Sequence, residues 1–202
     1  MKDKSTHNKI FKGTINALFQ RAAPFLDIRD NDVHVQISYE FAGRLLKCYP
    51  GADQEIVLPA IILHDIGWKT IPEEELFNSF GPKMKDNTNQ RRHETEGAKM
   101  ADDILSSLGF PRNKIDQITS IINGHDTRLE ALSLNDQLVK DADKLWRFTP
   151  TGVDIDHKRF GIKRDEYVAY LDTVIEQWMF TPEAKEMAQE ALNQVKEDVK
   201  GK

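Results

Sequence analysis

The sequence predicts an all-α fold, on two observations. Apolar residues recur mostly at intervals of three and four, the spacing that places them on one face of a helix. No convincing run alternates apolar and polar residues as a half-buried strand would. The 202 residues suit one domain with one core, so a single helical domain is expected over residues 1–202.

The first two helices are predicted near the start of the chain. One should cover about residues 8–22, and Pro24 should end or bend it, because proline lacks the N–H of a helical hydrogen bond. The second should follow an N-cap cluster at residues 30–32 and carry His34 on its apolar stripe. His34 is therefore expected to point inward.

A third helix is expected over residues 55–66 and should lie in the middle of the bundle, because it is apolar nearly all round. Gly67 is expected to close its C-terminal end. The pair His64 and Asp65 then lies at a buried helix end.

Residues 70–90 are polar and contain proline and asparagine, which predicts a long loop with a short helix at 73–77. Loops of that length inside compact domains often cover active sites.

Five further helices are expected. Gly109 and Pro111 mark the end of the first of them, and Thr181 should cap the last. Their approximate bounds are 91–108, 112–123, 135–148, 156–180 and 182–199.

Composition excludes several classes of function. A net charge of −5 opposes binding to polymeric nucleic acid. The apolar stretch 56–63 contains Pro59 and is far shorter than the roughly 20 residues that span a bilayer, so no membrane is expected as a partner. Cys48 is the single cysteine and no charged-then-apolar leader opens the chain, which favours the cytoplasm. The sequence is compatible with a homo-oligomer.

Four of the six histidines fall at predicted helix ends or on inward faces: His34, His64, His93 and His125. A single histidine on an apolar face is usually a hydrogen-bonded core residue. Asp65 is different, because a charged carboxylate at a buried helix end costs several kcal/mol without a partner cation. A metal ion would supply that cation.

Three segments resemble the HD-domain metal-dependent phosphohydrolases: the segment around His34, the string ILHDIGW with His64 and Asp65, and VKDADKLW with Asp143. The resemblance covers about residues 30–150 and implies an HD-domain-like helical bundle, with helices of about 156–199 packed on it. The family's last ligand precedes a lysine or its equivalent, which selects Asp143. Asp141 is then a candidate to support the ligands.

The strings RRHETEG and IINGHD place His93 and His125 as in the two-metal branches of that family, which include cyclic dinucleotide phosphodiesterases of the HD-GYP type. The likeness implies two divalent transition-metal ions bridged by Asp65, one on His34, His64, Asp65 and Asp143, the other on His93 and His125. Iron or manganese suits such ligands best, although magnesium, nickel, cobalt or zinc could bind.

The chain departs from the HD-GYP pattern in three ways. Asp126 follows His125 where that type has a second histidine, Trp68 follows the HDIG string where it has lysine, and the GYP string is absent. Cyclic di-GMP is therefore disfavoured as the substrate.

The resemblance implies hydrolysis of a phosphomonoester or phosphodiester of a nucleotide or another small phosphorylated metabolite. Catalytic candidates are Asp65, Lys69, Asp126 and Lys144, the middle two for proton transfer. Candidates for holding phosphate oxygens are Arg91, Arg92 and Arg147, together with Lys144.

Two alternatives remain open at this point. Oxygenases related to myo-inositol oxygenase share the pattern of four histidines and two aspartates but use a mixed-valent di-iron centre. A non-catalytic metal-binding sensor would also keep the ligands. Trp68 and Trp146 flank the motifs and would either stack on a nucleobase or belong to the core.

Overall fold

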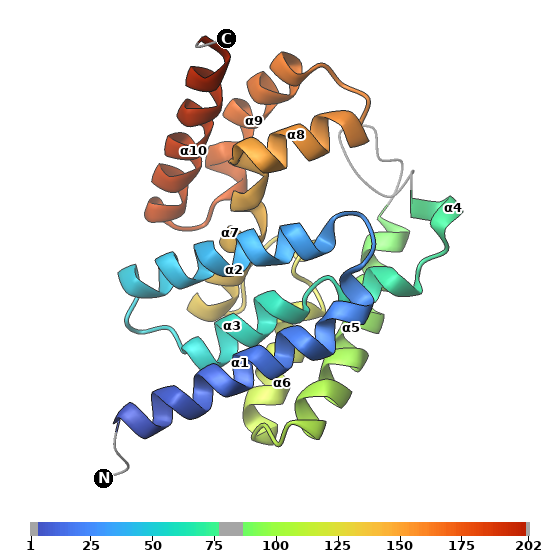
Figure 1. The fold of residues 1–202 in the computed structure, drawn as a ribbon, viewed down its shortest axis with the longest axis vertical. Coiled ribbons are helices and arrows are strands. Elements are labelled where there is room, and N and C mark those ends of the chain that lie inside the picture. The colour runs from blue at the N-terminus through green and yellow to red at the C-terminus, as the bar shows by residue number, and fades with distance from the viewer. Residues whose placement is uncertain (1–3, 77–86, 201–202) are drawn as a thin grey trace.

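Helices make up the regular structure of the computed structural model, which describes residues 4–76 and 87–200 (Figure 1). These residues form ten α-helices and two short 3₁₀ helices and contain no strand, so the all-α prediction is confirmed. The bounds are α1 Lys4–Leu26, α2 Asn31–Cys48, α3 Gln54–Leu63, η1 Ile66–Thr70, α4 Glu73–Leu76, α5 Thr88–Ser107, α6 Arg112–Ile122, α7 Leu134–Leu145, η2 Trp146–Phe148, α8 Pro150–Arg159, α9 Arg164–Trp178 and α10 Pro182–Lys200.

Helix α3 is the centre of the bundle and packs against α1, α2, α6 and α7. Every residue from Ile56 to Leu63 is buried, as the uniformly apolar sequence predicts. Asp53 caps the helix by accepting a hydrogen bond from the backbone N–H of Glu55 at 2.8 Å. Burial of each leucine or isoleucine in α3 contributes about 1.5–3 kcal/mol to the stability of the fold. The helix is therefore a rigid support for the residues that follow Leu63.

The end of α3 differs from the prediction. The helix stops at Leu63 and is followed by η1, which contains Gly67, so Gly67 does not close α3. The reason for a glycine is the close approach of α5. A Cβ on Gly67 would lie 2.0 Å from the carbonyl oxygen of His93 and 2.6 Å from the backbone nitrogen of Gly97. Gly67 therefore lets η1 lie directly against α5.

Helix α1 is longer than predicted and runs to Leu26, two residues past Pro24. Helix α5 begins at Thr88, which places His93 in its second turn. The short helix predicted at 73–77 is present as α4, although Phe77 lies outside the described residues. Much of the predicted active-site cover falls on residues 77–86, which also lie outside them.

The predicted helix over 156–180 is wrong, because two helices, α8 and α9, occupy that region. Gly161 has a φ of 62°, and the N–H groups of Gly161 and Ile162 bond to the carbonyls of Lys158 and His157. This is the Schellman arrangement that ends helices at glycine. The chain reverses there and returns as α9.

Helices α8, α9 and α10 gather at one end of the molecule, beyond α2 and α7, while α6 lies at the other end (Figure 1). Asp141 on α7 attaches α10, because it accepts hydrogen bonds from the N–H groups of Phe180 and Thr181 and from the Thr181 hydroxyl. Thr181 caps α10 as predicted, with its hydroxyl 3.3 Å from the N–H of Ala184.

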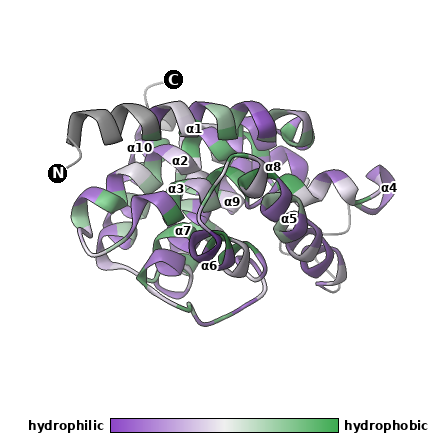
Figure 2. Cartoon of the chain, turned by 90° about the horizontal axis from the view of Figure 1, so that it is seen from below, coloured by the Kyte–Doolittle hydropathy of each residue, from purple (hydrophilic) through white to green (hydrophobic). Residues whose placement is uncertain are grey.

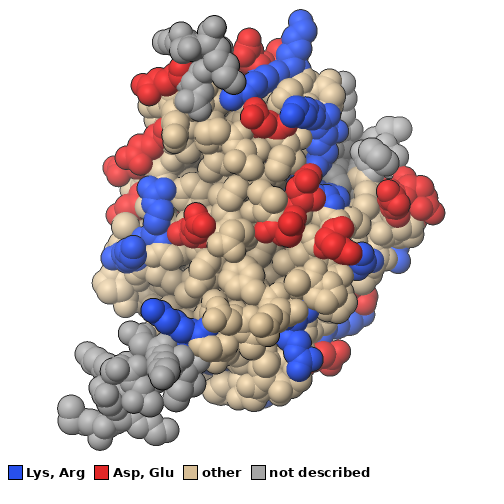
Figure 3. All heavy atoms as spheres, in the orientation of Figure 1, with Lys and Arg blue, Asp and Glu red and all other residues tan. Residues whose placement is uncertain are grey.

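Apolar residues gather where the helices face one another, and polar residues lie outward (Figure 2). On the face drawn in Figure 3, acidic and basic side chains are interspersed, with no broad area of one sign. Across the described ranges, no helix has both the length and the apolar character needed to cross a membrane.

Candidate metal centre

Four histidines and two aspartates that are far apart in the sequence converge beside the end of α3. They come from α2, the α3–η1 junction, α5, the turn after α6, and α7. All six side chains are buried, with exposed fractions of 0–5%. They are His34, His64, Asp65, His93, His125 and Asp143.

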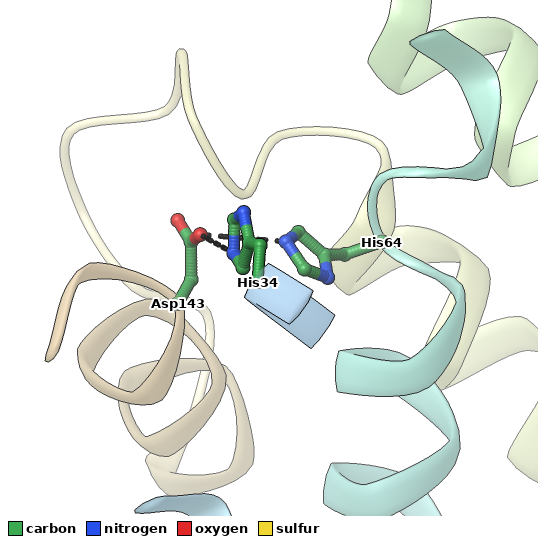
Figure 4. A group of neighbouring side chains, drawn as sticks. All are labelled: His34, His64 and Asp143. Carbon is green, nitrogen blue, oxygen red and sulfur yellow. Dashed lines mark ion pairs between the residues drawn. The ribbon is translucent and has the colours of Figure 1, made fainter. Parts of the chain in front are cut away.

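His34, His64 and Asp143 form the first cluster (Figure 4). Oδ1 of Asp143 lies 3.1 Å from Nε2 of His34 and 3.3 Å from Nε2 of His64. The carboxylate on α7 therefore faces both rings at once. Three donors in this arrangement leave room for one cation between them.

Asp65 lies between this cluster and a second one. Its Oδ1 is 3.6 Å from Nε2 of His64, 3.6 Å from Nε2 of His93 and 3.5 Å from Nε2 of His125. Its other oxygen lies 3.5 Å from Nδ1 of His34. One carboxylate is thus shared by both groups of histidines, which is the position that a bridging ligand needs.

The second cluster contains His93, His125 and Asp126. The Nε2 atoms of the two histidines are 3.3 Å apart, and Oδ2 of Asp126 lies 3.7 Å and 3.9 Å from them. Asp126 was considered above only for proton transfer. The structure places it where it can also act as a carboxylate ligand.

The hydrogen bonds of the imidazoles fit metal binding. Nδ1 of His64 bonds to the carbonyl of Ile61, and Nδ1 of His125 to the carbonyl of Ile122, each at 2.8 Å. These bonds assign the proton to Nδ1 and leave the Nε2 lone pair aimed into the clusters. Nε2 of His64 and Nε2 of His34 are buried without a hydrogen-bond partner in the described part of the chain. A cation held by the first cluster would satisfy both atoms.

The pKa values show how strongly this region needs positive charge. Burial raises the pKa of Asp65, but the surrounding imidazoles, His64 first, lower it well below its ordinary value. Burial lowers the pKa of His125, yet the hydrogen bond to Asp65 raises it to about 9. Burial and the neighbouring His125 lower the pKa of His93 to about 4. Protonated imidazoles would balance these carboxylates in the protein alone, and bound divalent cations would take over that role.

The HD-domain family matches residues 34–147, from the first of these converging residues to just beyond the last. The chain belongs to the HD-domain family. That span is more than half of the chain and contains all six converging residues, so the recognition from sequence is confirmed.

Among solved structures, the chain resembles the crystal structure of a predicted HD superfamily hydrolase from an uncultured Thermotogales bacterium. The two share 19% sequence identity and superpose with a TM-score of 0.59, over 91% of this chain and 87% of the other. At that identity the likeness shows a common fold. Among proteins with curated descriptions, none matches this chain.

Two tryptophans contact the candidate ligands of this HD domain. Nε1 of Trp68 donates a 3.0 Å hydrogen bond to Oδ1 of Asp65, and its ring stacks on His93 with centroids 3.8 Å apart. Trp146 stacks on His34 at 4.7 Å. Both rings are buried, so both belong to the core around the ligands. Groups that fix the orientation of ligands in this way are a regular part of metal sites.

Glu94, which sequence reasoning missed, holds the turn that carries His125. It is fully buried and accepts hydrogen bonds from the N–H groups of Asp126 and Thr127, each at 2.8 Å. Arg91, predicted to bind substrate, donates to Glu94 at 2.6 Å and to the carbonyl of Asn123 at 3.2 Å. Arg91 thus stabilises the same turn by hydrogen bonds.

Lys140 holds that turn from the other side and was also missed. Its buried ammonium donates to the carbonyls of Gly124, His125 and Arg128 at 2.7–2.8 Å. Burial lowers its pKa to about 8. A charged residue on a helix usually lies in solvent, so its sequence context alone could not reveal this role.

Two of the other predicted cations have partners outside the centre. Nζ of Lys69 lies 2.6 Å from Asp27, and Arg92 pairs with Glu75 at 3.8 Å. Asp141 bonds to the start of α10, and within residues 4–76 and 87–200 it makes no hydrogen bond or ion pair with the six converging residues. Lys144 is different, because its Nζ lies 3.6 Å from Oδ2 of Asp143.

A cavity of about 250 Å³ opens from the centre toward α8 and α9. His34, Asp65, Asp126 and Asp143 lie at its metal-facing end, with Lys144 next to them. Among the other wall residues, Arg147, Trp68 and Trp146 were candidates from sequence and the rest were not. These other wall residues are Arg29, Trp68, Gln90, Trp146, Arg147, Arg159, Phe160, Tyr167, Tyr170 and Trp178.

Proposed function

We propose that this HD-domain protein is a metal-dependent phosphohydrolase that uses two divalent ions. The observation that carries the proposal is the position of Asp65, whose single carboxylate lies 3.5–3.6 Å from histidines of both clusters. Paired ions that share a ligand are characteristic of sites that hydrolyse phosphate esters. The similar crystal structure is described as a predicted HD superfamily hydrolase, which agrees with this proposal.

One ion would be held by the first cluster together with Asp65, and the other by His93, His125 and Asp126 together with Asp65. Mixed imidazole and carboxylate ligands suit iron or manganese. Two divalent ions at these positions would supply Lewis-acid activation of water and of the phosphoryl group.

The remaining work falls to side chains of the cavity wall. Lys144, beside Asp143, can hold a phosphoryl oxygen and donate a proton to the leaving oxygen. Arg147 lines the same cavity and offers a planar fork for phosphoryl oxygens. We leave Lys69, Arg91 and Arg92 out of the reaction, because their side chains pair with other residues and do not line the cavity.

The cavity limits the substrate. At about 250 Å³ it is smaller than the roughly 300–1,000 Å³ of pockets for drug-sized ligands. A small phosphorylated metabolite is therefore favoured over a dinucleotide. A cytoplasmic location and a homo-oligomer stay predictions.

The test is a panel of phosphate monoesters and diesters offered to protein loaded with iron(II) or manganese(II), with metal content measured on each sample. Asp65→Asn keeps the size of the side chain and removes its charge, and it should lose both turnover and the second equivalent of metal. Full turnover by that variant would contradict the proposal. His93→Ala and His125→Ala should each lower the metal content from two ions to one per chain.

Two other outcomes would favour the alternatives. Iron-loaded protein that consumes oxygen with an organic substrate and releases no phosphate from any ester would be an oxygenase. Protein that holds two ions and turns over nothing would be a metal-binding sensor.

A further inference from the structure

The cavity has a second polar end, which is formed by three arginines. Arg29 precedes α2, Arg147 lies in η2, and Arg159 ends α8, yet all three line the same space. Arg29 and Arg159 lie outside residues 34–147, the span of the HD-domain match. This end of the cavity is therefore built mostly from parts of the chain that the family match does not cover.

Asp156 organises two of these arginines. It is completely buried and accepts hydrogen bonds from Nη1 of Arg147 at 2.5 Å, from Nη1 of Arg159 at 2.9 Å and from the hydroxyl of Tyr167 at 3.0 Å. Arg159 also pairs with the carboxylate of Asp30 at 3.4 Å, so two carboxylates balance these two guanidiniums and Arg29 adds the further positive charge. A guanidinium has five N–H donors, so each retains donors for a ligand. Their orientation is fixed in advance, which lowers the entropy lost on binding.

Arg29 reaches the cavity through an unusual turn. Arg29 and the next residue, Asp30, have φ values of 58° and 55°, in the left-handed region that residues other than glycine rarely adopt. Nη2 of Arg159 donates to the carbonyl of Arg29 and so ties the turn to α8. The guanidinium of Arg29 lies 4.6 Å above the ring of Trp68. Strained residues of this kind concentrate at functional sites, where packing holds a side chain in place.

Aromatic rings form the wall beside the arginines. The ring centroids of Tyr170 and Trp178 are 6.0 Å apart, and Tyr170 lies 6.3 Å from Tyr167. A wall of rings packs against the carbon skeleton of a small molecule, while the arginines take its charged group.

We propose that Arg29, Arg147 and Arg159 form a second anion subsite. It would bind a carboxylate or a second phosphoryl group on a small metabolite whose scissile phosphate lies at the metal centre. The identity of the group at the metal end rests on the proposed function, whereas the arginine subsite stands on its own contacts. The substrate class is thus a phosphate ester with an additional anionic group at its other end.

The first experiment does not depend on activity. Inorganic phosphate is titrated by calorimetry into protein treated with a chelator, in which the metal-facing end carries carboxylates and repels anions. Phosphate should bind, and Arg159→Gln should weaken binding by about tenfold or more, as expected for loss of a charge-assisted hydrogen bond. Arg112→Gln is the matched control, because Arg112 pairs with Asp102 and Asp116 on the surface. Equal binding by both variants, or none by the unaltered protein, would overturn the subsite.

Arg159→Lys is a second variant that keeps the test usable if Arg159→Gln does not fold. Lysine keeps the charge beside Asp156 and loses the planar fork, so phosphate should bind with intermediate affinity. The subsite is contradicted if both variants fold and both bind phosphate as tightly as the unaltered protein.

The second experiment compares esters of similar size on metal-loaded protein. Glycerol phosphate carries no further charge, phosphoglycerate adds a carboxylate, and a polyol bisphosphate adds a phosphoryl group. Arg159→Gln should raise KM for the preferred charged ester about tenfold more than for glycerol phosphate, and the preferred ester identifies the anion. If all three esters are hydrolysed with no such difference, the subsite is wrong and the phosphohydrolase stands. If none is hydrolysed but phosphate binding depends on Arg159, the proposed function fails and the subsite stands.

Discussion

Nε1 of Trp68 donates a hydrogen bond to Oδ1 of Asp65, the oxygen that also faces His64, His93 and His125. The same indole stacks on the ring of His93. One tryptophan therefore orients two residues of the metal centre, one by its N–H and one by its face.

Trp68→Phe should separate these two roles. Phenylalanine keeps an aromatic face against His93 and removes the hydrogen bond to Asp65. Metal affinity should fall by about 10- to 100-fold, the usual effect of losing a group that orients a ligand. Trp146→Phe is the control, because Trp146 stacks on His34 while its buried Nε1 has no hydrogen-bond partner among the described residues. Metal titration with equal losses in both variants would contradict the assignment.

Glu94→Ala should release the turn that carries His125. The N–H groups of Asp126 and Thr127 would lose their acceptor, which costs about 1–3 kcal/mol of unfolding free energy. The ion held by the second cluster should be lost before the other. Glu96→Ala on the same helix removes only a surface pair with Lys99 and should change neither quantity. Denaturant unfolding and metal analysis of both variants make the comparison, and two tightly held ions in Glu94→Ala would be the contrary result.

Metal-free protein should lose stability as the pH rises. The folded-state pKa of His125, about 9, is above its ordinary 6.5, so its contribution is complete below pH 6.5 and disappears as the pH rises through 9. The loss should be about 2 kcal/mol between pH 6.5 and 8, at about 1.4 kcal/mol per pH unit. Above pH 8 the lowered pKa of Lys140 acts in the opposite direction, because its buried ammonium loses its proton in the folded protein first. Metal-loaded protein should not show it, because an imidazole that binds metal is already neutral. A stability that is flat or rising between pH 6.5 and 8 in chelated protein would show that His125 does not carry the balancing charge.

Gly67→Ala should destabilise the fold. The added Cβ would meet backbone atoms of His93 and Gly97, which cannot move without displacing α5. Unfolding free energy should fall by about 1–3 kcal/mol or more. Gly43→Ala within α2 meets nothing within 4 Å and should instead stabilise the protein by about 0.5–1 kcal/mol. Thermal or denaturant unfolding distinguishes the two, and similar values for both would argue against close packing at Gly67.

Sequence patterns predicted the helices whose apolar residues lie on one face. They also predicted the candidate ligands whose charge or position is unusual for a buried residue. Asp65 was recognisable because a carboxylate at the end of an apolar helix needs a cation. The break at Gly161 was missed because apolar spacing continues on both sides of it, and only the positive φ shows the reversal.

The residues that sequence reasoning missed act through distant partners. Glu94 and Lys140 resemble solvated helix charges until the turn at residues 124–128 is placed between them. Arg29 depends on a left-handed turn and on Arg159, which is 130 residues away in the chain. Relationships of this kind depend on packing between helices, which no local pattern encodes.

The five successive residues from Lys140 to Lys144 on α7 each contact a different part of the molecule. Lys140 holds the His125 turn, Asp141 attaches α10, Ala142 is fully buried in the core, Asp143 faces the histidines and Lys144 lines the cavity. Because successive residues of a helix point in different directions, each side chain has its own surroundings to satisfy. A saturation scan of the chain should therefore find little tolerance for substitution at these positions, and no single exchange there can be compensated by its neighbour in sequence.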